Sequence, residues 1–217
     1  MRIERDFETE KSIIDVATLS VGGKRAGWHV TDLTRCLRKT FFERMGVEGV
    51  VEEGRVLRMK LGKMSEDLTD LFEAKQIQGE KDGIIGTVDG LLEDRIVEKK
   101  FTYLSSNKNI KEQVYWIEQV KAYCYIFGKN TVQFRIIHLL GNYKRPFKPE
   151  IRVWNVYFTD DEIKDFWNEI LFRKKYVEMC LLEKVLPEQS KFEWECKNCE
   201  YKEICMGGEI FGEDLCL

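Results

Sequence analysis

Histidine is scarce in this chain, and so are several signals that would point directly to an activity. Only two histidines, His29 and His138, occur among the 217 residues, so catalysis by a histidine pair is disfavoured. The chain also has no internal repeat, no low-complexity stretch and no glycine-rich phosphate loop. The chemistry must therefore be sought among other side chains.

Long apolar runs are missing as well. No stretch approaches the roughly 20 apolar residues of a membrane-spanning helix, and the charged residues 1–6 are not followed by the apolar segment of a signal peptide. Seven cysteines without an export signal favour a reducing compartment, where clustered cysteines bind metal more often than they form disulfides. We therefore expect a cytoplasmic protein with no membrane partner.

Positive charge is not in surplus, because 35 basic and 38 acidic residues give a net charge of −3. Any contact with nucleic acid must then come from a local basic patch and not from the field of the whole chain. Each candidate for such a patch could equally be solubilising surface. The candidates are Arg55, Arg58, Lys60, Lys63, Lys108, Lys111, Lys144, Arg145 and Lys148.

The most informative stretch covers residues 84–101, in which two apolar runs flank the acidic pair Glu93-Asp94. This pattern predicts a β-hairpin, although the pair lacks the glycine that hairpin turns favour. A turn at this pair places Asp89 opposite Glu98, with β-carbons roughly 5 Å apart. The hairpin therefore brings two carboxylates to one face.

Two carboxylates this close repel each other unless a cation lies between them, and Mg²⁺ or Mn²⁺ is the simplest such cation. Strand alternation returns Lys100 to the face of Asp89 and Glu98, whereas Lys99 points away. A metal ion beside an ammonium group suits phosphodiester hydrolysis. The alternative is a solvated face, but these charges lie within apolar sequence, where unpaired charges are costly.

The segments Gly86-Thr87-Val88-Asp89 and Val97-Glu98-Lys99-Lys100 resemble the D…ExK core of the RecB-like PD-(D/E)xK nucleases. Gln119 and Tyr123 match the QxxxY motif that RecB-type members carry on the next helix. The resemblance implies an α/β fold with a mixed central sheet flanked by helices. It also implies that Gln119 and Tyr123 position DNA or water, and that the main-chain carbonyl of Lys99 assists the metal.

An earlier helix is predicted over residues 57–74. RecB-like nucleases often carry a metal-binding histidine there, four residues after a glycine. This chain has Glu66 at that spacing from Gly62. A carboxylate can bind a hard metal ion, so Glu66 is either a further ligand or an ordinary surface residue.

The tail carries a second constellation, Cys196-x₂-Cys199-x₅-Cys205. Three thiolates this close cannot all pair with one another but can share a metal centre, and Cys36 is the candidate for a fourth ligand. Four thiolates suit zinc and an iron–sulfur cluster equally well. The remaining cysteines are expected in the core, at Cys124 and Cys180, and as a spare thiol at Cys216.

An early cysteine, a RecB-like core and a terminal C-x₂-C-x₅-C together resemble the CRISPR-associated (Cas) family-four exonucleases, and more widely the iron–sulfur RecB nucleases of the AddB type. The resemblance implies a [4Fe-4S] cluster on Cys36, Cys196, Cys199 and Cys205, with [2Fe-2S] as an alternative. It also implies 5′ to 3′ exonuclease action on single-stranded DNA, beside the Cas integrase, in CRISPR adaptation.

Three alternatives remain open at this stage. The chain could be a RecB- or AddB-like repair nuclease, a DNA-end-binding subunit that does not cleave, or a zinc-stapled structural module. A homo-oligomer and a monomer are both compatible with the composition.

We expect one nuclease domain over residues 1–217. Its core would span residues 55–185, and residues 28–50 and 188–217 together would form an iron–sulfur lobe stapled by the cluster. Hydrophobic periodicity predicts helices from residues 31 or 32 to 42, over 111–127 and from a capping box at Thr159. Residues 131–140 and 151–158 are predicted strands.

Overall fold

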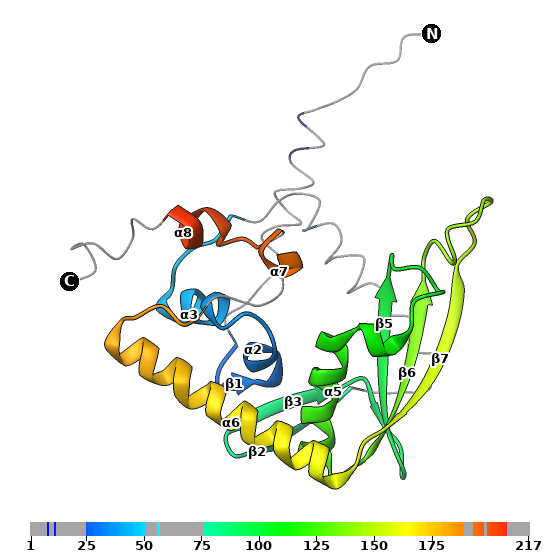
Figure 1. The fold of residues 1–217 in the computed structure, drawn as a ribbon, viewed down its shortest axis with the longest axis horizontal. Coiled ribbons are helices and arrows are strands. Elements are labelled where there is room, and N and C mark those ends of the chain that lie inside the picture. Colours follow the sequence, from blue (N-terminus) through cyan, green and yellow to red (C-terminus); the bar gives the residue numbers. More distant parts are fainter. Residues whose placement is uncertain are drawn as a thin grey trace.

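The computed structural model describes residues 8, 11, 25–50, 56, 76–188, 193–197 and 199–207, and within them the chain is a mixed α/β structure (Figure 1). The α/β part of the predicted fold class is thereby confirmed. The strands are β1 (Trp28–His29), β2 (Ile77–Lys81), β3 (Ile84–Val88), β4 (Gly90–Leu91), β5 (Ile96–Thr102), β6 (Thr131–His138) and β7 (Glu150–Tyr157). The helices are α2 (Val30–Thr34), α3 (Leu37–Met45), α5 (Val114–Phe127), α6 (Asp160–Glu183), α7 (Glu193–Lys197) and α8 (Lys202–Gly207), with a 3₁₀ turn, η2 (Ile110–Glu112). The helix predicted over residues 57–74, including Glu66, lies outside the described residues.

The strands form two mixed sheets where a single central sheet was predicted. One sheet has the order β1-β3-β2 and the other the order β4-β5-β6-β7. The predicted first strand of the hairpin is divided between them, because β3 pairs with β1 and β2 whereas β4 pairs with β5. Asp89 is the single residue between β3 and β4, so the point at which the chain changes sheets carries a predicted site residue.

The hairpin of β2 and β3 turns at Asp82-Gly83. Both residues have positive φ, at 51° and 69°, and Lys81 pairs with Ile84 across the turn. Two positive φ values at an Asp-Gly pair are typical of a type I′ turn, whose twist suits a two-residue hairpin. Strand β2 was not predicted, although this dipeptide is the stronger hairpin signal of the region.

Helix α5 packs closely on this hairpin because two glycines face it. Gly79 and Gly86 are paired across β2 and β3. A β-carbon at Gly86 would come within 2.8 Å of Ile126 and 3.0 Å of Tyr123, and one at Gly79 within 2.9 Å of Phe127. The absence of side chains at Gly79 and Gly86 therefore determines how close α5 lies to the hairpin, and with it the position of Tyr123. Helix α5 begins at Val114, after the turn η2, and not at the predicted residue 111.

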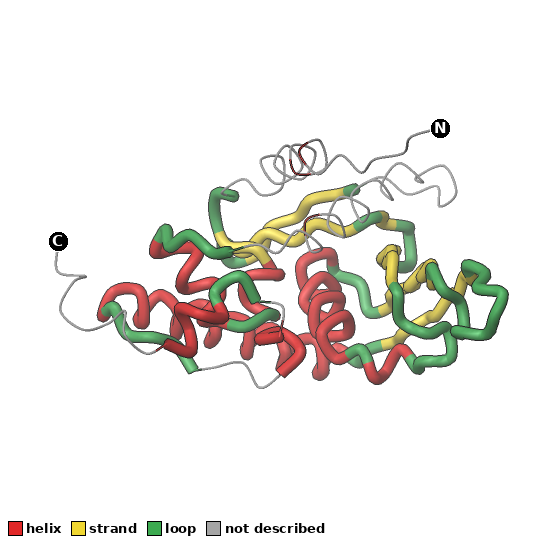
Figure 2. Tube along the Cα trace, turned by 90° about the horizontal axis from the view of Figure 1, so that it is seen from above, coloured by secondary structure: helices red, strands yellow, loops and turns green. Residues whose placement is uncertain are grey.

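Helix α6 confirms the prediction of a capping box. Thr159 accepts a hydrogen bond from the Glu162 backbone, and the Glu162 carboxylate accepts one from the Thr159 backbone at 2.8 Å. Trp167 on α6 stacks on Tyr125 of α5, with ring centroids 4.6 Å apart, and donates to Asp82 at 2.8 Å. Viewed from above, α5 stands between the other helices and the four-stranded sheet (Figure 2).

The helix predicted through residues 31–42 is two helices, α2 and α3. Arg35 is extended between them, and Cys36 is the N-cap of α3 rather than a residue within a helix. The break is held by a contact across 159 residues, because the Cys36 backbone N–H donates to the Glu195 carboxylate at 3.0 Å. Helix α3 ends at Gly46, a left-handed C-cap with φ 76°.

A second, smaller core joins the two ends of the described chain. Phe41 and Phe42 of α3 pack with Cys180 of α6 and with Tyr201, and the Phe42 and Tyr201 rings stack with centroids 5.2 Å apart. The early helix and the C-terminal residues thus share one core, which also takes in the end of α6. None of the described helices is long and apolar enough to cross a membrane.

Candidate active site

Asp89 lies where the chain leaves β3 and enters β4, and its side chain replaces a backbone partner there. Its Oδ2 accepts a hydrogen bond from the Lys99 backbone N–H at 2.7 Å. The pairs Gly90 with Val97 and Leu91 with Ile96, and the bond from the Leu92 backbone to Arg95, give the predicted register. Asp89 is therefore anchored beside the middle of β5, opposite Glu98.

Lys100 connects the strand to helix α5. Its Nζ donates to Glu98 Oε1 at 2.7 Å and to Gln119 Oε1 at 3.0 Å. Gln119 Nε2 in turn donates to the Tyr123 hydroxyl at 2.8 Å. Because Gln119 and Tyr123 are four residues apart on one helix, they lie one turn above each other. Hydrogen bonds thus join Glu98, Lys100, Gln119 and Tyr123 in one group, and Asp89 lies beside it, bonded to the Lys99 backbone.

Burial controls the protonation of this group. Glu98 is only 4% exposed, and burial, together with the nearby charge of Asp89, raises the pKa of Glu98 to about 7 although Lys100 opposes the shift. Burial lowers the pKa of Lys100, but the facing Glu98 carboxylate raises it more, so this pKa lies above its usual value. Burial also raises the pKa of Tyr123 well above its usual value. Near neutral pH, Lys100 and Tyr123 therefore keep their protons, and Glu98 titrates in this range.

Two carboxylates are the metal-binding groups that the described residues offer here. No three His, Cys, Asp or Glu side chains in the described part of the chain lie close enough to hold an ion together. A hard divalent ion at Asp89 and Glu98 would therefore complete its shell with main-chain oxygen, water or phosphate, as Mg²⁺ usually does. Whether Glu66 and the Lys99 carbonyl contribute stays a prediction.

All four cysteines of the predicted cluster line one cavity of about 320 Å³. Cys36 enters it from the start of α3, and the other three come from α7, α8 and the turn between them. None of the four is in a disulfide. Burial raises the pKa of the Cys199 thiol, and the neighbouring Cys36 adds to the rise. Residues distant in sequence are thus gathered around one space.

The fold is shared with a solved structure. SSO0001 superimposes with a TM-score of 0.59 at 20% identity, over 91% of this chain and 96% of that one. Lower scores of 0.44 and 0.45 relate the chain to an alkaline exonuclease from Laribacter hongkongensis, at 12% identity over 72% of this chain and 90% of that one, and to a phage-related exonuclease from Haemophilus somnus, at 14% identity over 71% and 83%. No family model and no curated protein matches the chain.

Tyr115 lines the cysteine cavity and is close enough to Lys100 for the lysine charge to affect its pKa, and it was not among the predicted site residues. It lines the cavity, its ring meets Trp194 of α7 edge-on at 6.0 Å, and its hydroxyl bonds to Thr34. Burial raises the pKa of Tyr115, and the charge of Lys100 opposes this rise. The available signal was its place four residues before Gln119 on the same helix.

Both histidines contact the main chain and stabilise the local fold. His138 is buried at the end of β6, where its Nδ1 lies 2.8 Å from the Leu104 carbonyl oxygen, and His29 is the N-cap residue of α2. His138 is therefore a buried strand histidine whose ring contacts the main chain. Cys124 is buried on α5 and Cys180 in the second core, as predicted, whereas Cys216 lies outside the described residues.

Proposed function

We propose that this chain is a deoxyribonuclease that hydrolyses phosphodiester bonds at Asp89, Glu98 and Lys100 with Mg²⁺ or Mn²⁺. The observation that carries the proposal is the connected group itself. The Glu98 carboxylate accepts from Lys100, whose orientation is fixed through Gln119 and Tyr123. Asp89 lies opposite Glu98 in the register of the two strands. A bound divalent ion would polarise the phosphoryl oxygen and make a bound water more acidic.

The protein side chains supply the remaining functions. A lysine ammonium has three N–H donors, and in the described residues Lys100 uses two of them, on Glu98 and Gln119. The third is available to a water molecule or to a phosphate oxygen. Tyr123 accepts from Gln119, so its own O–H is available to donate. Both groups can therefore hold the attacking water or the scissile phosphate without first losing an existing partner.

Metal affinity is expected to depend on pH through Glu98. A carboxyl group with a pKa of about 7 is protonated below that pH, and a metal ion must displace the proton. We therefore expect Mg²⁺ affinity to rise about tenfold between about pH 6 and about pH 8 and then to level off. Isothermal titration calorimetry in buffers of different ionisation enthalpy would also show proton release near pH 7.

A pH-independent affinity over this range would contradict the assignment of Glu98 as a ligand. Glu98→Gln provides the matched variant, because it keeps the shape of the side chain and removes the titrating group. It is expected to bind Mg²⁺ weakly at every pH and to release no proton.

We further propose that Cys36, Cys196, Cys199 and Cys205 hold an iron–sulfur cluster, of the [4Fe-4S] type, with [2Fe-2S] as the alternative. The proposal is supported by the cavity of about 320 Å³ that all four thiols line. Four thiols around one space could hold a cluster of several metal atoms or a zinc ion. The cluster would staple the early helix to the tail.

The finer parts of the proposal follow from the sequence motifs. Resemblance to the Cas family-four exonucleases suggests 5′ to 3′ exonuclease action on single-stranded DNA and work beside the Cas integrase in CRISPR adaptation. A RecB- or AddB-like role in DNA repair would use the same residues. The pathway is therefore a separate proposal from the chemistry.

The test is digestion of 5′-labelled, 3′-labelled and circular single-stranded DNA by anaerobically purified protein. Loss of linear DNA that requires Mg²⁺ or Mn²⁺ and spares the circle is expected, and the order in which the two labels are released gives the direction. Asp89→Asn is the control for a contaminating nuclease. Folded, brown protein that binds DNA but cleaves nothing with either metal would overturn the proposal in favour of a DNA-end-binding subunit.

A further inference from the structure

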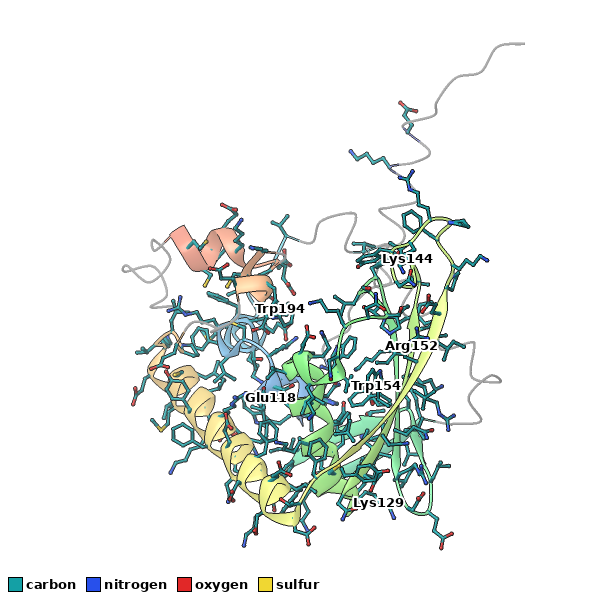
Figure 3. All side chains as sticks on the ribbon, turned by 45° about the vertical axis from the view of Figure 1, so that its right-hand side comes forward. Glu118, Lys129, Lys144, Arg152, Trp154 and Trp194 are labelled. Atoms are coloured by element: carbon teal, nitrogen blue, oxygen red, sulfur yellow. The ribbon has the colours of Figure 1, made fainter. Side chains whose placement is uncertain are left out.

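The loops beyond β5 and β6 form a tip that combines exposed rings with unpaired positive charge. We call residues 103–105 and 142–148 the tip. Tyr103, Tyr143 and Phe147 are 45%, 50% and 48% exposed, although rings of this size are usually buried in part for stability. Figure 1 shows the β6–β7 end projecting from the body of the molecule, and Figure 3 places Lys144 at this end and Lys129 at the opposite end.

The cations of the tip lack acidic partners among the described residues. Lys144, Arg145 and Lys148 are exposed, and the acid that follows them in the chain, Glu150, is engaged elsewhere. Glu150 pairs with Arg152 at 2.6 Å and accepts from the Ser106 hydroxyl at 2.7 Å. In a chain with a net charge of −3, this is a local concentration of available positive charge.

The base of the tip is held in one conformation by the two loops together. The Leu139 backbone N–H donates to the Thr102 carbonyl at 2.9 Å, and the Ser106 backbone N–H donates to the Gly141 carbonyl at 2.9 Å. Gly141 has φ 53°, and a β-carbon there would lie 2.3 Å from the Lys148 carbonyl oxygen. Gly141 therefore allows the loop to close tightly, and the closed loop holds its rings and cations in a preorganised arrangement.

The tip stands next to the candidate active site along the same strand. Thr102, which anchors it, is the second residue after Lys100 on β5, a spacing of about 7 Å along an extended strand. Tyr143 has φ 67°, an unfavourable conformation for a bulky side chain, and its hydroxyl bonds to the Tyr103 carbonyl. Arg145 lies 5.7 Å from the Phe147 ring centroid. Strained and exposed residues held in this way are characteristic of functional surfaces.

We propose that the tip binds single-stranded DNA and guides the strand to Asp89 and Glu98. Exposed rings stack on bases of any sequence, and cations beside them contact the phosphates. Unpaired strands suit this surface because their bases are accessible to Tyr143 and Phe147. The inference rests on the proposed nuclease function, to which it adds a substrate-binding surface.

The first test removes two cations from the tip with Lys144→Gln and Lys148→Gln in one protein. The matched control, Lys164→Gln with Lys175→Gln, removes two exposed cations from α6. Binding of labelled oligothymidylate is measured by fluorescence anisotropy with chelator present and at several salt concentrations. The tip variant is expected to bind about tenfold more weakly at low salt, and the slope of log affinity against log salt is expected to fall by about 1.4, at 0.7 per phosphate contact. The control is expected to match the wild type.

A second variant tests stacking separately from charge. Phe147→Ala is expected to weaken oligothymidylate binding about tenfold without changing the salt slope. Blunt duplex DNA, whose bases are not accessible to the ring, is expected to show no such loss. If both tip variants bind oligothymidylate with wild-type affinity and slope, the inference is overturned, and the tip is then a surface for another partner such as an acidic protein.

A second assay distinguishes an error in the proposal for the tip from an error in the proposal for the active site. Hydrolysis of bis(p-nitrophenyl) phosphate reports on the carboxylates and Lys100, because this diester is too small to span to the tip. Tip variants that bind oligothymidylate weakly but hydrolyse the small diester at the wild-type rate support the inference. If the wild-type protein hydrolyses neither DNA nor the small diester, the proposed nuclease function is wrong. Its binding of oligothymidylate, measured by anisotropy, still tests the role of the tip.

Discussion

Replacing Lys100 with alanine is expected to reduce DNA cleavage by about 10²–10³-fold, the range seen when one charge-stabilising donor is removed from an active site. Lys100 donates to Glu98 and Gln119 and keeps its proton because the Glu98 carboxylate faces it. No other described side chain donates to both groups. The measurement is single-turnover cleavage of labelled single-stranded DNA with saturating Mg²⁺.

The experiment has a matched control in the neighbouring residue. Lys99→Ala removes the same side chain from the opposite face of β5 and keeps the backbone N–H that holds Asp89. It is expected to cleave at close to the wild-type rate. Metal and DNA binding by Lys100→Ala is measured at a pH well above the pKa of Glu98, because loss of the Lys100 charge raises that pKa further. Wild-type cleavage by Lys100→Ala would show that the active site lies elsewhere.

Replacing Cys199 with alanine is expected to give a colourless and poorly soluble protein. Cys199 lines the cavity with the three other cysteines and packs against the second core. If a cluster joins α3 to the tail, its loss removes a link between two segments that are more than 140 residues apart in sequence. The hydrogen bond from Arg38 to the Pro187 carbonyl is another contact between these segments. Folding and cluster binding are then coupled. Visible absorption and iron and sulfide analysis of anaerobic protein provide the measurement.

Cys180→Ala is the control for loss of a cysteine from the same small core. Cys180 packs with Phe41 and Tyr201 but does not line the cavity, so this variant should stay brown and soluble. A brown, soluble Cys199→Ala protein would remove that residue from the cluster. Colourless wild-type protein with bound zinc would instead favour a zinc-stapled module.

Local patterns carried much of the fold and most of the candidate active site. The register that faces Asp89 with Glu98 followed from counting outward from Glu93-Asp94, and it is the register observed. The spacing of Gln119 and Tyr123 gave their shared face, and their hydrogen bond shows that face turned toward Lys100. Each inference needed only the period of a strand or a helix, which neighbouring residues determine.

Other features depended on contacts between distant parts of the chain. The helix predicted through Cys36 is interrupted there because the Cys36 backbone N–H finds a partner in Glu195. Helix propensity near Cys36 cannot reveal that partner, since tertiary context overrides local preference. Tyr115 was also missed. Its spacing from Gln119 placed it on the same side of α5, but its proximity to Trp194 and Lys100 depends on the tertiary structure.

The sequence by itself determined which residues can alternate onto one face of a strand or one side of a helix: Asp89 with Glu98 and Lys100, and Gln119 with Tyr123. Only the tertiary structure decided that the strand changes sheets at Asp89, that α5 approaches closely over Gly79 and Gly86, and that four distant cysteines surround one cavity. Periodicity is a property of adjacent residues, whereas the pairing of strands and the meeting of chain ends depend on burial shared by the whole molecule.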